Sequence, residues 1–420
     1  MNVTITPTAL GGTVEAIPSK SHAHRLIICA SLSDAPVHLV CPATSRDIEA
    51  TAECMRALGA RIERTADGYD ITPIDGDGCG GRARLDCGES GSTLRFLLPV
   101  CAALGGEFEF NMHGRLPERP LSPLYEILTE GGLRLSEQGS CPLTMSGRLT
   151  TRSFSISANV SSQYISGLLF ASPLIAEKCT VTLTTPPEST GYIDMTVESM
   201  RRFGVSVEVS EQEGLPVYTV SGSYTTPERI VRAEGDWSNA AFWLCAGAIG
   251  SSPVTVTGLS SDSLQPDRAI VDILRAFGAE ITQHGGSYTV YPSRLVGTRI
   301  DVSQTPDLAP VISVVAACAE SPSEIVGGAR LKIKESDRIS STCSMIRSLG
   351  GRAQERDDGM LIYPTGLSGG VVDSWGDHRI AMAAAISATV ASENITILTA
   401  EATEKSYPSF FEDLEKLKQI

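Results

Sequence analysis

The sequence predicts a mixed α/β (α+β) fold of two domains, built from six copies of one repeat of about 72 residues. Three observations predict this fold. A glycine that follows a helical stretch recurs at spacings of 73, 72, 74 and 72 residues. A second helix, apolar and with a polar start, recurs at the same period, and alternating strand patterns lie between the helices. The 420 residues are enough for two or three domains.

The first landmark of each repeat is a helical stretch, a glycine and a short strand. The landmark glycines are Gly59, Gly132, Gly204, Gly278 and Gly350. A sixth helix at 410–420 falls on the same period, but the chain ends before its strand. Residues 2–17 read as strands without a helix pair, so we expect them to complete this sixth repeat.

The second landmark is a helix rich in Ala, Leu and Ile. Its polar starts stand at 19–25, 89–95, 161–167, 234–240, 305–310 and 375–381. These helices are apolar almost all round, which predicts that they are buried. The segments between them alternate as strands do, for example at 154–160, 178–185 and 252–259.

Six stacked repeats could form a solenoid. Buried helices favour two compact domains of three repeats instead, because a solenoid repeat exposes one face. The predicted domains are residues 20–232 and, completed by the N-terminal strands, residues 1–19 plus 233–420.

Composition excludes several classes of protein. Lys and Arg total 34 against 49 Asp and Glu, a net charge of −15, which disfavours binding to nucleic acid or to an anionic membrane. No apolar run reaches the ~18 residues of a spanning helix, and the start lacks a signal-peptide pattern. Eleven scattered cysteines without a CxxC pair predict a reducing, cytoplasmic location. The six histidines show no metal-ligand spacing, so no metal is expected.

The polar helix starts are candidate anion sites, because a helix N-terminus presents unpaired N–H groups and a positive dipole. Capping alone explains Ser92, Ser161 and Asp236. It does not explain the cations close to these starts, which are Lys20, Arg25, Arg95 and Arg379. Only seven lysines occur in the chain, and four of them lie in the polar motifs.

Three further motifs bring charge to helix starts. In LKIKESDRI (331–339) a carboxylate stands between lysines and an arginine, an arrangement suited to proton transfer or to a surface ion-pair ladder. GDHRIA (376–381) and TEKSYPSFFEDL (403–414) each add a cation, and Arg119 precedes Pro120. The residues alone thus predict two domains, a basic cleft and an acidic or phosphorylated small ligand.

Together, these segments resemble the 5-enolpyruvylshikimate-3-phosphate (EPSP) synthase family, in the family's order from PSKSHAHR to EKSYPSFFEDL. The resemblance implies the enolpyruvyl transferase fold, an inside-out α/β barrel with three βαβαββ repeats in each of two domains that close over the ligands. It implies transfer of enolpyruvyl from phosphoenolpyruvate to the 5-hydroxyl of shikimate 3-phosphate. It also implies no metal or organic cofactor and a cytoplasmic monomer.

The resemblance also assigns the site residues. Those expected to bind shikimate 3-phosphate are Lys20, Ser21, Arg25, Ser161, Ser162, Gln163, Ser189, Asp307, Arg330 and Lys334. Those expected to bind phosphoenolpyruvate are Lys20, Gly91, Arg119, Gln163, Arg338, Arg379 and Lys405. The expected catalytic residues are Asp307 as proton acceptor and Glu335 as proton donor, with Lys20 and Lys405; the division of proton transfers among Asp307, Glu335 and Lys405 stays open.

Two positions depart from the family pattern. Glu89 stands where asparagine is usual, and a carboxylate there would repel phosphoenolpyruvate unless it is paired. Arg330 stands where Asn or His is common.

Two alternatives remain. A UDP-N-acetylglucosamine enolpyruvyl transferase would commonly carry Lys-Asn where Lys20-Ser21 stands, and a cysteine in the loop 114–120, which has none. A non-catalytic anion-binding repeat protein would need the cations but not Asp307 and Glu335.

Overall fold

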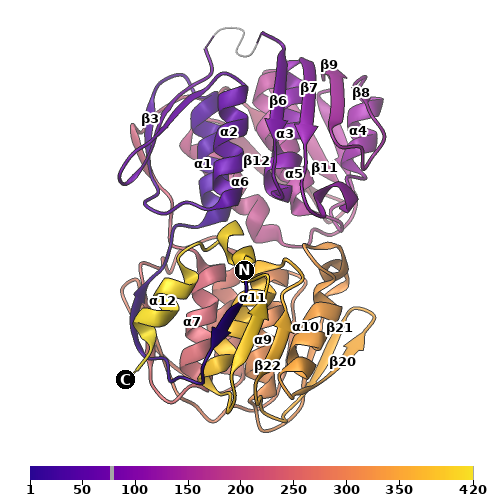
Figure 1. Cartoon of the computed structure of the whole chain (residues 1–420). Helices are drawn as coiled ribbons and strands as arrows, with labels where there is room; N and C mark the ends of the chain where they lie inside the picture. Colours follow the sequence, from indigo (N-terminus) through magenta and orange to yellow (C-terminus); the bar gives the residue numbers. More distant parts are fainter. Residues whose placement is uncertain (76–79, 420) are drawn as a thin grey trace. The chain divides into compact units, whose positions relative to one another are not determined.

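The computed structural model describes residues 1–75 and 80–419, and their contacts divide the chain into two compact units (Figure 1). Unit 1 comprises Met1–Ile17 and Glu234–Ile420, and unit 2 comprises Pro18–Ala233. Unit 2 is therefore one continuous stretch of chain, whereas unit 1 is assembled from two stretches.

Unit 2 contains three four-stranded sheets, with strand orders β14-β3-β5-β4, β6-β7-β9-β8 and β10-β11-β13-β12. Its strands are β3 (Val37–Val40), β4 (Arg61–Arg64), β5 (Gly68–Thr72), β6 (Arg82–Asp86), β7 (Gly106–Asn111), β8 (Arg134–Leu135), β9 (Leu143–Gly147), β10 (Ser153–Ile156), β11 (Lys178–Leu183), β12 (Ser206–Gln212), β13 (Leu215–Ser221) and β14 (Ile230–Arg232). Its helices are α1 (Lys20–Leu32), α2 (Arg46–Ala57), α3 (Gly91–Leu104), the 3-10 helix η1 (Leu116–Glu118), α4 (Leu124–Glu130), α5 (Ser162–Ile175) and α6 (Thr190–Arg202).

Unit 1 contains two four-stranded sheets and one three-stranded sheet, with orders β2-β15-β17-β16, β18-β19-β21-β20 and β22-β23-β1. Its strands are β1 (Val3–Ile5), β2 (Gly12–Glu15), β15 (Val254–Thr257), β16 (Glu280–His284), β17 (Ser287–Tyr291), β18 (Arg299–Asp301), β19 (Ser323–Val326), β20 (Arg352–Arg356), β21 (Gly359–Tyr363), β22 (Gly370–Asp373) and β23 (Ile395–Leu398). Its helices are α7 (Trp237–Ile249), η2 (Pro266–Ala269), α8 (Ile270–Ala276), η3 (Pro306–Leu308), α9 (Ala309–Ala317), η4 (Ala329–Ile333), α10 (Arg338–Ser348), α11 (His378–Ile386), η5 (Ser387–Thr389), η6 (Ala400–Lys405) and α12 (Phe410–Leu417).

The repeat predicted from the sequence is confirmed as a βαβαββ element order. It is seen plainly in β10-α5-β11-α6-β12-β13. In this sheet β10 runs parallel to β11, and β13 runs antiparallel to both β11 and β12. A parallel pair needs a crossover, which the first helix supplies, whereas the last two strands need only a tight turn. Each four-stranded sheet repeats this arrangement.

The prediction for residues 2–17 is right for β1 and wrong for β2. Strand β1 completes the sixth sheet, where Val3 pairs with Ile397 of β23. Strand β2 instead runs parallel to β15 in the fourth sheet, where Val14 pairs with Val256. The reason is an exchange of first strands, because the strand just before α7 is β14, which pairs with β3 in unit 2. In Figure 1 the indigo strands of the N-terminus therefore lie in unit 1, one of them beside the yellow helix α12.

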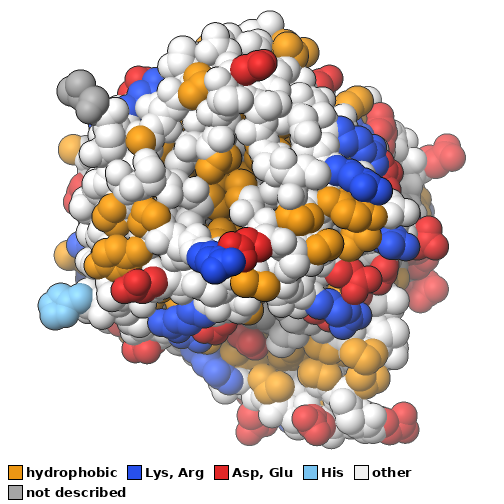
Figure 2. Space-filling model, turned by 90° about the horizontal axis from the view of Figure 1, so that it is seen from below, with side chains coloured by type: hydrophobic (Ala, Val, Ile, Leu, Met, Phe, Trp, Pro, Cys, Tyr) orange, Lys and Arg blue, Asp and Glu red, His pale blue; other side chains and the backbone are white. Residues whose placement is uncertain are grey.

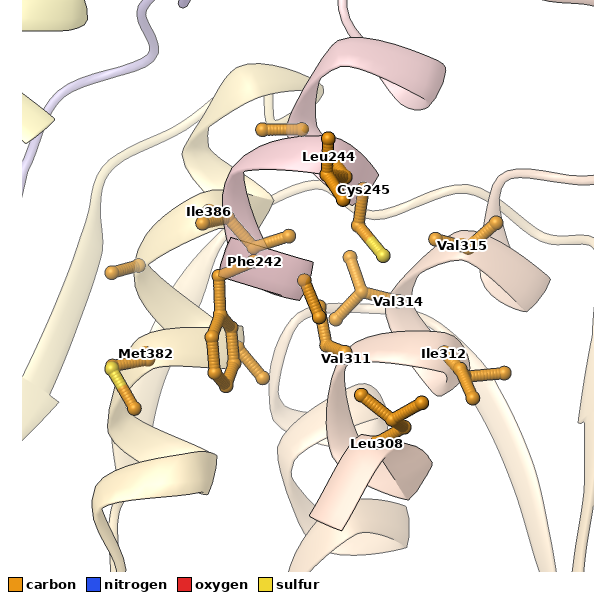
Figure 3. Close-up of a cluster of buried hydrophobic side chains, with 14 of the residues drawn as sticks. Phe242, Leu244, Cys245, Leu308, Val311, Ile312, Val314, Val315, Met382 and Ile386 are labelled. Carbon is orange, nitrogen blue, oxygen red and sulfur yellow. The ribbon is translucent and has the colours of Figure 1, made fainter. Parts of the chain in front are cut away.

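The helices that the sequence predicts to be buried form the middle of each unit. In unit 1, side chains of α7, α9 and α11 converge, among them Phe242, Val311 and Ile386, all 0 % exposed (Figure 3). In unit 2, α3 and α5 approach closely at Gly167, where a Cβ atom would lie 2.4 Å from the Arg95 carbonyl oxygen. Burial of one helix per repeat thus builds both cores.

The surface of the structure carries both acidic and basic side chains. Acidic and basic side chains are interspersed on the face that Figure 2 shows. Among residues 1–75 and 80–419, no helix is long and apolar enough to cross a membrane. The ten cysteines in this part of the chain are all free thiols.

Two buried histidines of α1 predict a pH-dependent stability. Burial, with Arg202 and Arg25 nearby, lowers the pKa of His22 to about 3, and burial, with Lys20 and Arg25, lowers the pKa of His24 to about 3. Both groups titrate near 6.5 in the unfolded chain, so below that pH the unfolded state binds more protons. We expect the free energy of unfolding to fall by up to about 1.4 kcal/mol per pH unit for each histidine between pH 6.5 and 3.

Urea unfolding at pH 7, 6 and 5 measures this slope above the range where carboxylates titrate. His22→Gln should remove about half of the histidine contribution. The matched control is His284→Gln, at an exposed position of β16. An unfolding free energy that does not change between pH 7 and 5 would contradict the prediction.

Candidate active site

In unit 2, α1, α3 and α5 begin at serine caps. The Ser19 hydroxyl accepts from the His22 amide at 3.3 Å, Ser90 from the Thr93 amide at 3.2 Å, and Ser161 from the Gln163 amide at 3.3 Å. The capping expected of Ser161 is therefore confirmed. The capping expected of Ser92 is wrong, because Ser90 takes that place.

Ser92 instead joins α3 to α5. Its hydroxyl accepts from Nε2 of the Gln163 side chain at 2.9 Å. The side-chain oxygen Oε1 of Gln163 accepts in turn from the Arg95 guanidinium at 2.8 Å. Arg95 also donates to the Pro120 carbonyl at 3.1 Å, next to Arg119. This network sets the start of α5 against the start of α3.

Gly91, the first residue of α3, lies directly beside Arg119. A Cβ atom at position 91 would stand 2.8 Å from the Arg119 guanidinium and 3.3 Å from that of Arg95. The two cations and the bare backbone of Gly91 therefore share one small region, as an anion site requires. Glu89 lies close by, with its carboxylate against Gly114, where a Cβ atom would be 2.7 Å from the Glu89 Cδ atom.

Lys20, the first residue of α1, pairs with Asp47 on α2. The Lys20 ammonium lies 2.8 Å from the Asp47 carboxylate, with the two side chains 15 % and 6 % exposed. This pair fixes the ammonium at the start of the helix.

Arg25 is buried against α6. Its Nε donates to Thr196 Oγ1 at 2.9 Å, and its other two nitrogens donate to the carbonyls of Ser21 and Tyr192 at 2.5 and 2.7 Å. Burial lowers the pKa of Arg25 to about 10, so it remains a cation at neutral pH. Three of its five N–H groups are used by these contacts, which leaves two for a ligand.

Ser189 stands at the start of α6 in a left-handed conformation, with φ of 56°, and is 2 % exposed. A left-handed non-glycine residue costs free energy and often marks a functional site. Tyr192, which accepts from Arg25, lies one turn further along α6.

In unit 1, one buried guanidinium gathers three carboxylates. Arg338, the first residue of α10, is 1 % exposed. It donates to Asp307 at 2.7 Å, to Glu335 at 2.8 Å and to Asp377 at 2.8 Å. Burial acts to lower the pKa of Arg338, but these carboxylates together raise it well above its ordinary value.

Asp307 lies between two arginines. One of its oxygens accepts from Arg338 and the other from Arg379 at 3.2 Å. Burial acts to raise the pKa of Asp307, but Arg379, Arg338 and Lys334 hold it well below its ordinary value. Arg379 is fixed in turn by Ser238, whose hydroxyl and carbonyl accept at 2.7 and 2.9 Å.

Asp377 accepts hydrogen bonds from both arginines, from the side chain of Arg338 and from the backbone amide of Arg379. It is 0 % exposed, caps α11 by accepting the Arg379 amide at 2.9 Å, and accepts from Ser336 at 3.1 Å as well as from Arg338. A buried carboxylate with this many donors is held in one orientation. Sequence analysis read this segment only as a polar helix start that brings Arg379, and so missed Asp377.

Two lysines lie close to these carboxylates, and Arg330 lies near one of the lysines, Lys334. The Lys405 ammonium lies 4.0 Å from Glu335, and the Lys334 ammonium lies 3.9 Å from Asp307. Burial, helped by Arg330 and Arg338 against the opposing effect of Asp307, lowers the pKa of Lys334 to about 8. Arg330 itself donates to the Ser303 carbonyl at 2.7 Å and is 9 % exposed.

The expected residues thus fall into two sets, one in each unit. The set in unit 2 is Lys20, Ser21, Arg25, Gly91, Arg119, Ser161, Ser162, Gln163 and Ser189. The set in unit 1 is Asp307, Arg330, Lys334, Glu335, Arg338, Arg379 and Lys405. In unit 2, Gly91 and Arg119 lie together and are joined to Gln163 through Arg95. In unit 1, hydrogen bonds and ion pairs join six of the residues, Asp307, Lys334, Glu335, Arg338, Arg379 and Lys405, whereas Arg330 donates to the Ser303 carbonyl.

Besides Asp377, sequence analysis missed Asp47 and Thr196. Each is the partner of a recognised cation and stands far from it in the chain. The only sequence signal for Asp47 is a carboxylate in the first turn of a helix, which is common in any protein.

Comparisons with known proteins show which family the chain belongs to. The sequence model of EPSP synthase (3-phosphoshikimate 1-carboxyvinyltransferase) matches residues 5–414. The 3-phosphoshikimate 1-carboxyvinyltransferase of Clostridium kluyveri is 41 % identical over 419 residues, covering 99 % of this chain and 97 % of the relative. That of Clostridium acetobutylicum is 39 % identical over 420 residues, with 99 % and 97 % covered.

Solved structures share the fold. EPSP synthase from Acinetobacter baumannii superposes with a TM-score of 0.80 at 23 % identity, covering 99 % of this chain and 98 % of that one. The enolpyruvyl transferase NikO from Streptomyces tendae gives a TM-score of 0.78 at 19 % identity, with 99 % and 97 % covered. The two-domain enolpyruvyl transferase fold predicted from the sequence is confirmed, and the chain belongs to the EPSP synthase family, a family of transferases.

Proposed function

We propose that this protein transfers the enolpyruvyl group of phosphoenolpyruvate to the 5-hydroxyl of shikimate 3-phosphate and releases phosphate. The observation that carries the proposal is the sharing of one buried guanidinium, that of Arg338, by Asp307 and Glu335. A transferase of this kind needs one group to accept a proton from the hydroxyl and another to donate a proton to the methylene carbon. Two carboxylates held side by side among cations supply both, and a simple anion-binding protein has no use for them.

We assign shikimate 3-phosphate to Lys20, Ser21, Arg25, Ser161, Ser162, Gln163, Ser189, Asp307, Arg330 and Lys334. Two features support this assignment. Arg25 keeps two N–H groups beyond its three internal contacts, which matches bidentate binding of a carboxylate. Ser161 and Ser162 stand at the start of α5, where backbone N–H groups favour a phosphate.

We assign phosphoenolpyruvate to Lys20, Gly91, Arg119, Gln163, Arg338, Arg379 and Lys405. Gly91 and Arg119 lie together, and the bare backbone of Gly91 leaves space for the anion that a side chain would fill. The family pattern has asparagine where Glu89 stands, and the Glu89 carboxylate against Gly114 brings a negative charge to this region.

The proposed reaction is an addition followed by an elimination. In the addition, the 5-hydroxyl oxygen bonds to C2 of phosphoenolpyruvate, its proton passes to Asp307, and the C2=C3 electron pair takes a proton from Glu335. The product is a tetrahedral ketal phosphate with a methyl group. In the elimination, the C2–O bond to phosphate breaks, the Glu335 carboxylate left by the addition takes a methyl proton, and the electron pair of that C–H bond forms the C2=C3 double bond again. Asp307 gives its proton to the departing phosphate. Arginines and lysines already in place favour the charge on phosphate as it leaves.

The contacts of Asp307 in unit 1 imply that bound phosphoenolpyruvate also changes the basicity of this carboxylate. Arg338 and Arg379 both donate to Asp307, which keeps the pKa of that carboxyl too low for a strong base. An anionic substrate that takes over these guanidinium groups frees Asp307 and raises its basicity. The acceptor hydroxyl is therefore activated only when the donor is bound.

The depressed pKa of Lys334 predicts a pH-dependent affinity for shikimate 3-phosphate. Only the ammonium form attracts the anionic substrate, so the KM for shikimate 3-phosphate should rise as pH increases through about 8. Lys334→Arg should flatten the profile, because an arginine stays protonated. Lys178→Arg, at the exposed first residue of β11, is the matched control and should keep the parent profile. A parent KM that does not change between pH 7 and 9.5 would contradict the assignment.

The test of the function itself is phosphate release from phosphoenolpyruvate with shikimate 3-phosphate or UDP-N-acetylglucosamine as acceptor, without added metal. We expect release with shikimate 3-phosphate alone. Release only with the sugar nucleotide would make this protein a different enolpyruvyl transferase. No release with either acceptor would favour a non-catalytic anion-binding protein.

We further propose that the two units are the two domains of the enzyme and that it acts as a monomer in the cytoplasm. The contact division at residues 17–18 and 233–234 supports the first part. Free thiols throughout the described chain fit a reducing compartment.

A further inference from the structure

A line of buried hydrogen bonds joins the first three helices of unit 2. His24 Nδ1 on α1 lies 2.6 Å from Thr51 Oγ1 on α2, which lies 2.6 Å from Thr93 Oγ1 on α3. Thr93 Oγ1 donates to Ser90 Oγ at 2.8 Å. His24, Thr51, Thr93 and Ser90 are all 0 % exposed.

The direction of this line fixes the state of the imidazole. Thr93 uses its only hydroxyl proton on Ser90, so it accepts from Thr51, and Thr51 in turn accepts from His24 Nδ1–H. His24 Nε2 is also buried and has no hydrogen-bond partner among the described residues. A bare acceptor there costs less than an unpaired N–H would. His24 is therefore neutral and carries its proton on Nδ1.

The same helices are joined by a second contact one turn away. Lys20 and His24 are four residues apart on α1, and their partners Asp47 and Thr51 are four residues apart on α2, so each pair lies on one helix face. The Lys20–Asp47 pair and the His24–Thr51 bond thus form two parallel rungs. Together they fix the rotation of α1 about its axis and its axial position relative to α2.

The line ends where α3 begins. Ser90 caps α3, and the next residue is Gly91, which lies beside Arg119. The imidazole of His24 also meets the edge of the Phe96 ring on α3, with ring centroids 6.4 Å apart and an interplanar angle of 84°. The position of the first residues of α3 relative to α1 is therefore fixed by a series of hydrogen bonds between fully buried side chains.

We propose that the His24–Thr51–Thr93–Ser90 chain is a positioning relay that sets the start of α3, with Gly91, relative to Lys20 at the start of α1. The proposal rests on the proposed function, since Lys20 and Gly91 are both assigned to phosphoenolpyruvate. Apolar side chains would pack these helices at less cost, because every buried polar group must find a partner. The directional bonds supply what apolar packing lacks, which is a single register.

The first test needs no variant and no turnover. Two-bond ¹H–¹⁵N correlation spectra of the free protein between pH 5 and 8 report the tautomer and charge of each histidine. We expect one histidine, assigned by its loss in His24→Asn, to keep its proton on Nδ1 throughout this range, with Asp47, Lys20 and Arg25 as its charged neighbours. A proton on Nε2, or an imidazolium at pH 7, would overturn the relay even if the enzyme is active.

The second test measures the effect on phosphoenolpyruvate. Thr51→Val keeps the shape of the side chain but removes the hydroxyl, and kcat/KM for phosphoenolpyruvate should fall by roughly 10- to 100-fold, since small displacements of reacting groups cost this much. Thr51→Ser restores the hydroxyl and should recover most of that loss. The matched control is Thr342→Val in unit 1, a buried threonine whose hydroxyl has no hydrogen-bond partner among the described residues.

The outcomes separate the relay from the function and from simple loss of stability. A Thr51→Val protein that only folds less well would lose kcat in proportion to its folded fraction, with KM for phosphoenolpyruvate unchanged, and this would overturn the positioning role. Parent kinetics in folded Thr51→Val, or equal defects in the Val and Ser variants, would do the same. If the parent does not use phosphoenolpyruvate at all, the proposed function fails, while the tautomer measurement still decides whether the relay exists.

Discussion

Replacement of Asp377 by asparagine should both destabilise the protein and weaken its use of phosphoenolpyruvate. The carboxylate is fully buried and is the partner of Arg338 Nε, so its removal leaves a buried guanidinium with less charge around it. Loss of one partner from a buried pair costs about 3 kcal/mol, the lower end of the usual range, because Asp307 and Glu335 still contact Arg338. Since Asp377 also fixes the start of α11, which carries Arg379, kcat/KM for phosphoenolpyruvate should fall by roughly 100-fold.

Urea unfolding and steady-state kinetics on one preparation measure both effects. The matched control is Asp373→Asn at the end of β22, four residues before Asp377, where an exposed carboxylate accepts from the Trp375 amide at 2.8 Å. Asparagine can accept that bond too, so this change should stay within about 0.5 kcal/mol of the parent. An Asp377→Asn protein as stable and active as the parent would show that Asp307 and Glu335 alone hold the arginines.

Glu335→Gln should abolish turnover while leaving shikimate 3-phosphate binding intact. Glutamine has nearly the same shape but cannot give a proton to the methylene carbon, and loss of a general acid costs roughly 10²- to 10⁴-fold in kcat. The side chain contacts Arg338 and lies near Lys405, both assigned to phosphoenolpyruvate. Calorimetric titration with shikimate 3-phosphate should therefore give the parent affinity.

The same chemical change at Glu355, whose exposed carboxylate pairs with Arg347 at 3.2 Å, is the control and should leave turnover unchanged. If Glu335→Gln turned over at the parent rate, the acid would be another group, and Lys405 would be the next to test. If it lost shikimate 3-phosphate binding as well, the residue would serve to bind the acceptor rather than to donate a proton.

Much of the fold could be predicted because a repeated pattern reports the same physics several times. A helix that is apolar all round must be buried, and a glycine after each second helix marks the same turn in each repeat, as at Gly204, where φ is 78°. The partner of β2 could not be predicted in this way. Alternation shows that residues 12–15 form a strand, but the sheet that receives it depends on where β14 goes, more than 200 residues away.

The site shows the same division between local and distant information. Arg379 could be predicted because cations at helix starts are unusual in so acidic a chain, and Arg338 because it stands in the charged segment LKIKESDRI. The hydrogen bonds from both arginines to Asp307 could not be predicted, because the three residues come from separate segments that meet only in the folded unit. Asp377 and Asp47 were missed for a related reason, since an acidic residue at a helix start is the ordinary case. The roles of all these residues remain predictions until the variants are measured.

The exchange of first strands imposes an order on synthesis. Unit 2 is one continuous stretch that is made before most of unit 1, so it can fold while the rest of the chain is still being translated. Strands β1 and β2 are made first but cannot pair until later strands are made. Strand β2 pairs with β15, and β1 pairs with β23, where the hydroxyls of Thr4 and Thr396 are joined by a hydrogen bond across 392 positions of the chain. During that interval the backbone N–H and C=O groups of these first strands have no strand to pair with, which leaves their edges open to pairing with another chain.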